Sequence, residues 1–438
     1  MTKKIAFKTL GCRLNLFETD AIASAFSKKD FQIVDFDQSA DVYVINTCTV
    51  TNQSDSRSRK VIKQTQRINK NALTIVTGCM ATNYKEQLQQ NKDIDYVVDN
   101  DHKTSVLSVV ESHYRGEIVN PDQFEKDLFD YAAADETFHT RSLIKIQDGC
   151  DNFCTFCIIP KVRGRASSRP AAEIFENIKK VVEFGFKEVV LTGVNLGRYN
   201  YEDYNFEKLV EEILDIPGDF RVRISSIEPD GYSESFFRLF AHPKLTPHMH
   251  ICLQSGSEDI LLKMRRMYTA QLFEEMAGKL KASRPGFNLT TDIIVGFPGE
   301  TENDFQQTLE LSKRIGFGHI HTFKYSVRKG TRAERMADQI PDKVKSSRSE
   351  TIRQLAEKMK LDYRKTFVGK KQKVLIEKID NDGFAIGFGD HYIPVIIQEQ
   401  GLERNTFYDV QISGLTLKDE PMLVGERKKI KYKAVRIN

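Results

Sequence analysis

Three cysteines within eight residues constrain this 438-residue chain more than any other feature of its sequence. Cys150, Cys154 and Cys157 form a C-x3-C-x2-C pattern, which brings three thiolates into one loop. Four cysteines would saturate a 4Fe-4S cluster, whereas three leave one iron open to a small molecule. The alternatives are a zinc knuckle, which would need a fourth cysteine or histidine close by, and a chance group of structural cysteines. The spacing favours an iron-sulfur cluster with one open coordination position.

A second set of three cysteines follows predicted strands near the start of the chain. Apolar runs alternate there with polar helical runs, which is the pattern of a parallel sheet with crossover helices. Cys12, Cys48 and Cys79 each stand at the carboxyl end of such a run. A buried structural role is the ordinary interpretation of any one of them. Because open α/β sheets gather their ligands at this edge, the shared position predicts a second three-thiolate cluster. We interpret the seventh cysteine, Cys252, as a core residue.

The pattern along the chain is α/β and predicts three domains and a linker. We expect a parallel α/β domain at residues 1–116, an acidic linker at 117–138, a partial (β/α)6 barrel at 139–368 and a small all-β barrel at 369–438. The strands expected in the larger barrel are 142–147, 188–195, 221–226, 248–254, 288–296 and 319–326. The small barrel should contain the strands 372–378, 383–388, 391–398, 407–415 and 421–428.

Charge and composition limit the location and the partners. No run approaches the roughly 18 apolar residues of a membrane span, and the first residues lack a signal peptide's apolar core, so we expect a cytoplasmic protein without membrane contact. The net charge is only +4, so a nucleic-acid partner must be argued from the distribution of charge. From Pro421 to Asn438 six basic residues face one acidic residue, a net +5. This basic tail suits phosphate binding, although a solvated charged terminus is an equal alternative.

The cysteine loop resembles that of radical S-adenosylmethionine (SAM) enzymes, and other runs extend the resemblance over nearly the whole chain. These runs are Thr9 to Asn15, Asn46 to Asn52, Thr77 to Cys79, Cys150 to Pro160 and Gly296 to Thr301. Together they are similar to the methylthiotransferase family, which combines a cluster domain, a radical SAM barrel and a TRAM domain. Its members add a methylthio group to a tRNA adenosine or to a ribosomal-protein aspartate. The run from Cys48 to Arg59 is most similar to members that act on N6-threonylcarbamoyladenosine.

The resemblance implies two 4Fe-4S clusters and SAM as cofactors. The Cys150, Cys154 and Cys157 set would hold the cluster that cleaves SAM, and the Cys12, Cys48 and Cys79 set an auxiliary cluster that carries sulfur. One SAM would methylate this sulfur, and a second would supply the radical that takes hydrogen from C2 of the adenine. The implied product is 2-methylthio-N6-threonylcarbamoyladenosine at tRNA position 37.

The implied partners are a tRNA anticodon stem-loop and an electron donor such as flavodoxin or ferredoxin. Alternatives are the same chemistry on isopentenyladenosine tRNA or on a ribosomal-protein aspartate, and a non-catalytic iron-sulfur protein that binds RNA. The sequence names no general base.

Polar, glycine and aromatic residues near the strand ends of the larger barrel are predicted to bind SAM, through close backbone approach, hydrogen bonds and stacking on adenine. They are Phe156, Gly193, Asn195, Glu228, Gln254, Ser255 and Asp292. Any one glycine at a strand end is more often a turn residue. Arg163 and Arg165 are predicted to bind substrate, with Arg165 as the candidate for the threonylcarbamoyl carboxylate. Contact with tRNA phosphates or a helix cap is the alternative for both arginines.

Overall fold

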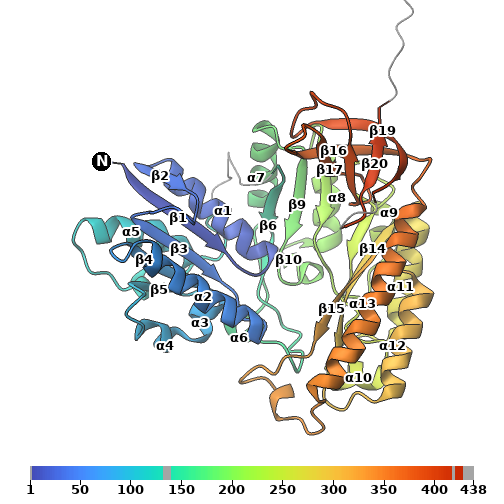
Figure 1. Cartoon of the computed structure of the whole chain (residues 1–438), viewed down its shortest axis with the longest axis horizontal. Helices are drawn as coiled ribbons and strands as arrows, with labels where there is room; N and C mark the ends of the chain where they lie inside the picture. Colours follow the sequence, from blue (N-terminus) through green and yellow to red (C-terminus); the bar gives the residue numbers. More distant parts are fainter. Residues whose placement is uncertain (1, 132–139, 417–419, 428–438) are drawn as a thin grey trace, which may run out of the picture.

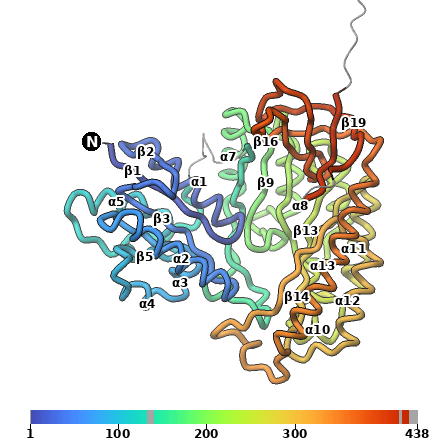
Figure 2. Tube along the Cα trace, viewed as in Figure 1, coloured from blue at the N-terminus to red at the C-terminus, as the bar shows by residue number. Residues whose placement is uncertain are grey.

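The computed structural model of the chain describes residues 2–131, 140–416 and 420–427. Figure 1 shows an N-terminal α/β domain beside a larger open barrel, with a small all-β barrel packed at one end of the larger one. The tube in Figure 2 follows the chain through these parts in sequence order. The predicted three-part α/β architecture is confirmed.

The N-terminal domain is a five-stranded parallel sheet with the strand order β2-β1-β3-β4-β5. Its strands are β1 (Lys3–Thr9), β2 (Phe31–Val34), β3 (Val42–Thr47), β4 (Leu73–Gly78) and β5 (Tyr96–Val98). Its helices are α1 (Arg13–Ser27), α2 (Asn52–Ile68), α3 (Cys79–Asn83), α4 (Lys85–Gln89), η1 (Lys103–Ser105) and α5 (Val106–Tyr114). All residues of the central strands β3 and β4 are buried, as expected for a parallel sheet covered on both faces.

The larger barrel consists of two three-stranded parallel sheets, β6-β9-β12 and β13-β14-β15. Single parallel bridges, Val222 with Leu245 and Ile227 with Ile251, join them into one curved wall. The strands are β6 (Ser142–Lys145), β9 (Glu188–Thr192), β12 (Arg221–Ile224), β13 (His248–His250), β14 (Asn288–Val295) and β15 (His319–Lys324). All six predicted strands are therefore present, each shorter at its carboxyl end than the sequence indicated. No pairing between β15 and β6 closes the wall within the described residues.

Helices cover the outside of this wall, and the largest hydrophobic core among the described residues lies between the strands and these helices. The helices are α6 (Ile159–Arg163), α7 (Ala171–Glu183), α8 (Phe206–Asp215), α9 (Glu234–Leu239), α10 (Glu258–Lys263), α11 (Ala270–Ser283), α12 (Glu302–Ile315) and α13 (Asp342–Lys365). Short elements occupy the loops, namely η2 (Pro121–Gln123), β7 (Gln147–Asp148), β8 (Ser167–Ser168), η3 (Leu196–Arg198), β10 (Asn200–Tyr201), β11 (Tyr204–Asn205) and η4 (Ala333–Arg335). The long helix α13 packs along β15 and leads to the small barrel.

The C-terminal part is a closed five-stranded barrel with the order β16-β17-β18-β20-β19. Its strands are β16 (Lys371–Ile379), β17 (Ala385–Phe388), β18 (Pro394–Ile397), β19 (Phe407–Leu415) and β20 (Leu423–Glu426). All five predicted strands are present. Arg427 is described, whereas the other basic residues of the predicted tail lie outside the described residues.

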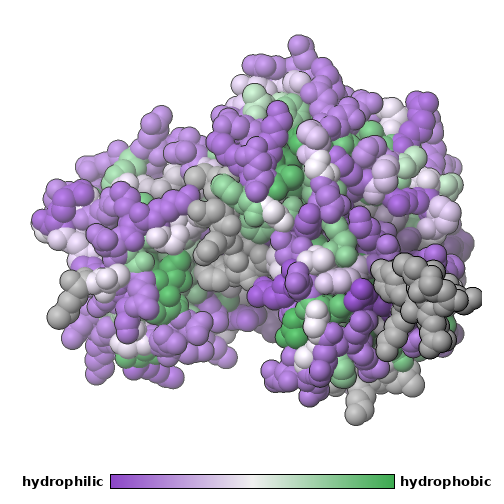
Figure 3. All heavy atoms as spheres, turned by 90° about the horizontal axis from the view of Figure 1, so that it is seen from above, coloured by the Kyte–Doolittle hydropathy of each residue, from purple (hydrophilic) through white to green (hydrophobic). Residues whose placement is uncertain are grey.

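The described part of the predicted linker packs against the N-terminal domain. Tyr131 is only 6% exposed, and its ring meets Phe17 edge to face with the centroids 5.3 Å apart. The domain boundaries at residues 116, 138 and 368 stay predictions. No helix among the described residues is long and apolar enough to cross a membrane. Hydrophilic side chains cover most of the face shown in Figure 3.

Candidate active site

The three N-terminal cysteines follow neighbouring strands of one sheet. Thr9 of β1 pairs with Asn46 of β3, and Thr47 at the end of β3 pairs with Gly78 of β4. Cys12, Cys48 and Cys79 therefore leave the same sheet edge. Burial raises the pKa of Cys48, and the neighbouring Cys79 and Cys12 thiols raise it further.

Gly11 allows close approach at this edge. Its φ is +101°, and a Cβ atom there would lie 2.7 Å from Cβ and 2.9 Å from Sγ of Cys48. A side chain at this position would collide with a ligand cysteine, so the local backbone requires glycine. The structure thus brings together the three cysteines that the sequence placed at strand ends.

The loop of Cys150, Cys154 and Cys157 follows β7 and is fixed from two sides. The Cys150 amide donates to the Gly164 carbonyl over 3.2 Å, and the Thr155 amide donates to the Met264 carbonyl over 3.0 Å. Amides also donate to two of the sulfurs, from Asn152 to Cys150 Sγ over 3.5 Å and from Ile159 to Cys157 Sγ over 3.4 Å. Burial, reinforced by the neighbouring Cys154 thiol, raises the pKa of Cys157 to about 12. Protons on these thiols must therefore leave when a metal binds.

The spacing of the thiols suits a cluster of several metal ions better than one ion. Among the described residues, neither cysteine set brings three ligand atoms within 4.8 Å of one another. Thiolates around one zinc ion, at about 2.3 Å from the metal, would lie within about 4 Å of each other. As described, neither cysteine set is close enough to hold one zinc ion through all three of its thiolates.

Arg266 is a site residue that the sequence reasoning missed. Its Nη1 donates to Cys154 Sγ over 3.2 Å, and its Nη2 forms an ion pair with the Glu228 carboxylate. Its Nε donates to the Tyr268 hydroxyl over 3.1 Å. Arg266 thus brings a cation within hydrogen-bond distance of one sulfur of the cysteine loop. No sequence motif marks Arg266, because it reaches the cysteine loop from the segment after α10.

Two amides among the predicted SAM-binding residues are buried without partners. Asn195 is 2% exposed, its side chain lies near the Cys150 thiol, and neither its Nδ2 nor its Oδ1 has a hydrogen-bond partner at the usual distances among the described residues. Gln254 is 8% exposed with an unpaired Oε1, and its φ of +64° is unusual for a residue other than glycine. Buried polar groups without partners and strained backbone both occur at ligand sites. These two residues fit a role in binding SAM.

The other predicted SAM-binding residues lie in different surroundings. A Cβ on Gly193 would lie 2.8 Å from the Gln147 carbonyl, so this glycine serves a close backbone contact. Phe156 packs on Phe297 with a centroid distance of 6.2 Å. Ser255 is 1% exposed, and its hydroxyl lies 3.3 Å from that of Thr308 on α12. Their assignment to SAM stays a prediction.

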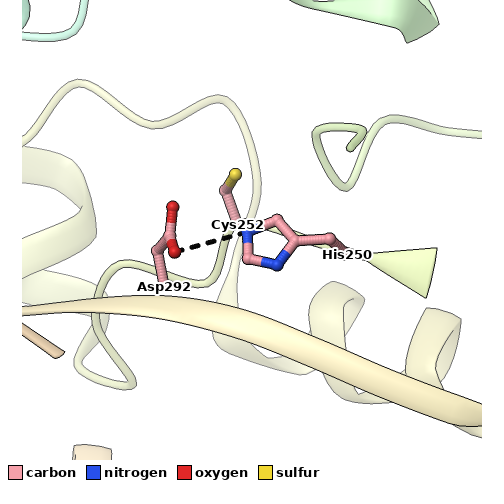
Figure 4. A group of neighbouring side chains, drawn as sticks. All are labelled: His250, Cys252 and Asp292. Atoms are coloured by element: carbon pink, nitrogen blue, oxygen red, sulfur yellow. Dashed lines mark ion pairs between the residues drawn. The ribbon is translucent and has the colours of Figure 1, made fainter. Parts of the chain in front are cut away.

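Asp292 belongs to a group of three ionisable side chains that faces the inside of the barrel. Figure 4 shows Asp292 of β14 beside His250 of β13 and Cys252, with 3.4 Å between His250 Nε2 and Asp292 Oδ1. One ligand atom from each residue lies within 4.8 Å of the other two. Cys252 is only partly buried, so the interpretation of it as a core residue is wrong: its thiol lies beside two polar groups.

Arg163 does not face a substrate, which corrects the sequence assignment. It is 3% exposed and lies between the N-terminal domain and the barrel. Its Nη1 donates to Glu18 of α1 over 3.0 Å and to Asp148 over 2.9 Å, and its Nη2 donates to Asn15 over 2.6 Å. Lys103 and Lys145 complete this buried network through ion pairs with Glu18. The network fixes the domain of one cysteine set against the domain of the other.

Arg165 lies at the surface beside the cysteine loop. Its side chain is 74% exposed, its Nε lies 3.2 Å from Asp151, and its guanidinium stands 5.1 Å from the centroid of Phe153. Its predicted role in binding the substrate stays a prediction.

A cavity of about 380 Å³ lies where the three domains meet. The N-terminal domain contributes Arg13, the residue after Cys12, and the small barrel contributes Tyr392. Four histidines of the larger barrel complete much of the wall, namely His248, His250, His319 and His321. These histidines are cavity residues that the sequence reasoning missed. The signal was their i, i+2 alternation within β13 and β15, which places each pair on one face.

Two family comparisons cover the N-terminal and the central domain. Residues 4–99 match the Uncharacterized protein family UPF0004, and residues 144–312 match the Radical SAM superfamily. Among solved structures, the radical S-adenosylmethionine methyltransferase TsrM from Kitasatospora setae, with cobalamin and a 4Fe-4S cluster bound, has a similar fold. The TM-score is 0.54 at 14% identity, over 74% of this chain and 75% of that one. The fold and the three-cysteine loop together define a radical SAM enzyme.

Curated relatives cover nearly the whole chain. "Threonylcarbamoyladenosine tRNA methylthiotransferase MtaB" of Bacillus subtilis (strain 168) is 38% identical over 408 residues, 90% of each chain. The protein of the same name from Aquifex aeolicus (strain VF5) is 38% identical over 383 residues, 85% of this chain and 92% of that one. "tRNA-2-methylthio-N(6)-dimethylallyladenosine synthase" of Fusobacterium nucleatum subsp. nucleatum is 35% identical over 389 residues, 86% of this chain and 88% of that one. This chain belongs to the radical SAM methylthiotransferase family, with SAM and 4Fe-4S clusters as its cofactors.

Proposed function

We propose that this protein adds a methylthio group to C2 of N6-threonylcarbamoyladenosine at position 37 of a tRNA. The observation that carries the proposal is the 38% identity, over 90% of both chains, to a relative named for this substrate. The position of all six cysteines at strand ends or in the C-x3-C-x2-C loop supports it.

The residues of this chain hold and orient the reacting groups. When bound, the clusters and SAM supply the sulfur, the methyl group and a carbon-centred radical. The Cys150, Cys154 and Cys157 set would hold the cluster that binds SAM, and the unpaired amides of Asn195 and Gln254 would bind SAM itself. The Cys12, Cys48 and Cys79 set would hold the auxiliary cluster. The buried network of Glu18 and Arg163 keeps the two sets in a fixed relation.

The second candidate substrate is dimethylallyladenosine in tRNA, because a relative named for that product is 35% identical. A dimethylallyl group is apolar, whereas the cavity at the junction of the three domains combines apolar side chains such as Phe388 and Ile393 with arginine, histidine and tyrosine side chains. This lining favours a polar group on the substrate.

The proposed partners follow from the proposed reaction. The substrate would be a tRNA anticodon stem-loop, with the small barrel acting as a TRAM domain that binds RNA. Reduction of the SAM-binding cluster requires an electron donor such as flavodoxin or ferredoxin. A tRNA substrate places the protein in the cytoplasm.

Mass spectrometry of tRNA nucleosides tests the proposal directly. Anaerobically reconstituted protein should convert N6-threonylcarbamoyladenosine in tRNA to its 2-methylthio derivative, and a Cys154→Ala variant should not. Methylthiolation of dimethylallyladenosine instead would support the second candidate. No methylthio product on either tRNA would refute the proposed activity.

A further inference from the structure

The cavity at the junction of the three domains has the size and position of a substrate site. Its volume of about 380 Å³ lies within the roughly 300–1,000 Å³ range of ligand pockets. Arg13 on one wall directly follows Cys12 of the auxiliary set. His250 on another wall lies beside Cys252, whose carbonyl accepts a hydrogen bond from Tyr268 over 2.7 Å. Tyr268 contacts Arg266, the donor to Cys154. The lining residues His248, Asn288 and His319 begin β13, β14 and β15, so the cavity lies at the amino ends of these strands. It borders the residue after Cys12 and is linked to Cys154 through the contacts of Cys252, Tyr268 and Arg266.

Arg13 brings a positive charge without a matching carboxylate. It is solvent-accessible, and its one hydrogen bond among the described residues runs from Nη1 to the Ser225 carbonyl over 3.4 Å. The acidic side chains near the cavity are already paired, Glu420 with Arg364 at 2.8 Å and Asp292 with His250 at 3.4 Å. Arg13 is thus the cation in this cavity, among the residues described, that is free to bind an anion.

Several guanidinium groups surround Tyr392, which lies in the cavity wall with Arg13. Its hydroxyl accepts a hydrogen bond from Arg141 over 2.6 Å, and the Arg223 guanidinium stands 3.9 Å from its ring centroid. Burial alone would raise the pKa of Tyr392, but the guanidinium groups of Arg223, Arg141 and Arg13 lower it below the ordinary value. The φ of Tyr392 is +55°, a strained conformation that holds its ring in the cavity wall.

Buried nitrogen atoms without partners also point to a ligand. His248 is 3% exposed and lines the cavity, and its Nδ1 has no hydrogen-bond partner among the described residues. His319 also lines the cavity, and its Nδ1 likewise has no partner in the described part of the chain. Buried polar atoms without partners are rare in folded proteins, because each costs free energy unless a ligand or water satisfies it.

We propose that this cavity binds the threonylcarbamoyl group on N6 of the substrate adenosine, and that Arg13 pairs with its carboxylate. The inference rests on the proposed function and names the residue that selects the substrate. His248 and His319 supply hydrogen bonds to the polar atoms of the same group. A guanidinium can bind a carboxylate through two parallel hydrogen bonds, which an apolar dimethylallyl group cannot form. Arg165 is left free to contact tRNA phosphates at the surface.

The test compares two anticodon stem-loops that differ by one charge. One carries N6-threonylcarbamoyladenosine, and the other carries the carboxamide of the same group, which has nearly the same shape and no charge. Binding to the holoenzyme is measured by fluorescence anisotropy without oxygen. The wild-type protein should bind the acid about ten- to a hundredfold more tightly than the carboxamide. Arg13→Gln should reduce this preference to less than about twofold, while Arg13→Lys keeps part of it.

The matched control is Arg115→Gln, which removes a cation from the same domain. The Arg115 side chain is 57% exposed, follows α5 and pairs with Glu117. The preference of this variant for the acid over the carboxamide stem-loop should therefore equal that of the wild type. Iron content and the melting temperature establish that each variant is folded. Wild-type protein that binds acid and carboxamide equally would overturn the inference without any variant. An equal loss of affinity for the acid and the carboxamide stem-loop in Arg13→Gln would also overturn the inference.

Product analysis separates this inference from the proposed function. If the wild-type protein forms no methylthio product from the acid stem-loop, the proposed function fails. If it methylthiolates acid and carboxamide equally well, the function stands and the role of Arg13 is wrong.

Discussion

At the residue scale, burial decides what each arginine near the cysteine loop does. Arg163 and Arg165 are two positions apart, yet one is 3% exposed and the other has a side chain that is 74% exposed. Arg163 donates to Glu18, Asp148 and Asn15, and these contacts cross between two domains. A buried charge is tolerated only when it is paired in this way.

Replacing Arg163 with Gln should lower the free energy of unfolding by about 3 kcal/mol or more, because Glu18 and Asp148 would remain buried with one cation fewer. Urea denaturation at pH 7 measures the change. Arg165→Gln is the matched control and should change stability by less than about 0.5 kcal/mol, since that side chain is exposed. A stable Arg163→Gln variant with weakened tRNA binding would return Arg163 to the substrate site.

The same network predicts a loss of stability in acid. Burial alone would raise the pKa of Glu18, but Arg163, Lys103 and Lys145 hold it well below its ordinary value. Because the folded pKa is the lower one, this stabilisation is present above the unfolded pKa of about 4.3 and disappears as the pH falls. Unfolding measured between pH 7 and pH 3 should therefore show a shallower loss of stability in Glu18→Gln than in the wild type. Parallel curves would show that Glu18 does not titrate with folding.

Arg266 should tune the cluster of the Cys150 set. Its hydrogen bond and positive charge at Cys154 favour the more negative, reduced cluster. Arg266→Gln should shift the reduction potential downward by tens of millivolts, given that about 59 mV corresponds to a tenfold change for one electron. A redox titration followed by electron paramagnetic resonance measures this shift. An unchanged potential would limit Arg266 to holding Glu228 and Tyr268.

At the element scale, strand register decides which polar side chains meet. Asn288 of β14 pairs in register with His248, and Asp292 pairs with His321 of β15. The alternation of side chains along a strand then places His248, His250, His319 and His321 on the same face of the sheet, where the rings of His250 and His321 lie 5.7 Å apart. The strands belong to three different stretches of sequence, so the grouping of these histidines depends on the sheet.

The basic tail should strengthen tRNA binding without affecting SAM cleavage. Deleting residues 428–438 removes five cations, Lys428, Lys429, Lys431, Lys433 and Arg436. The affinity for tRNA should fall, and the slope of log K against log salt should flatten by up to about 0.9 for each phosphate that the shortened chain no longer neutralises. Deoxyadenosine release should be unchanged. An affinity and salt slope equal to those of the full chain would show that the tail is only a solvated terminus.

At the scale of the whole molecule, the two cysteine sets sit in different domains, which the buried network of Arg163 joins. Each set follows strands of its own sheet, so each should hold its cluster independently. Changing Cys150, Cys154 and Cys157 together to Ala should leave about four irons per chain of the roughly eight in the wild type. Iron analysis and Mössbauer spectroscopy check this, and retention of about eight irons would refute the assignment.

A variant without the N-terminal cysteines separates SAM cleavage from methylthio transfer. Changing Cys12, Cys48 and Cys79 to Ala should preserve reductive cleavage of SAM and abolish methylthiolation. The measurement is deoxyadenosine release beside the amount of modified nucleoside. Product formation at the wild-type rate would make the N-terminal set structural.

Local sequence patterns were enough to predict most strands of this protein and its two sets of candidate cluster cysteines. Continuous apolar runs predicted the strands before the N-terminal cysteines and those of the larger barrel, and alternation of apolar and polar residues predicted the strands of the small barrel. The spacing of Cys150, Cys154 and Cys157 gave one cluster site, because those three ligands lie in one loop. Cys12, Cys48 and Cys79 were predictable because parallel strands share a carboxyl edge.

Only the tertiary structure decided the contacts between distant segments. Arg266 reaches Cys154 from 112 residues away, and Arg163 reaches Glu18 from 145 residues away. Arg13, His248 and Tyr392 meet because three domains pack together at one cavity. Side chains that converge across domain boundaries share no spacing in the sequence, so no local pattern could reveal Arg163 as an interdomain ion pair or Arg13 as the free cation among the described cavity residues.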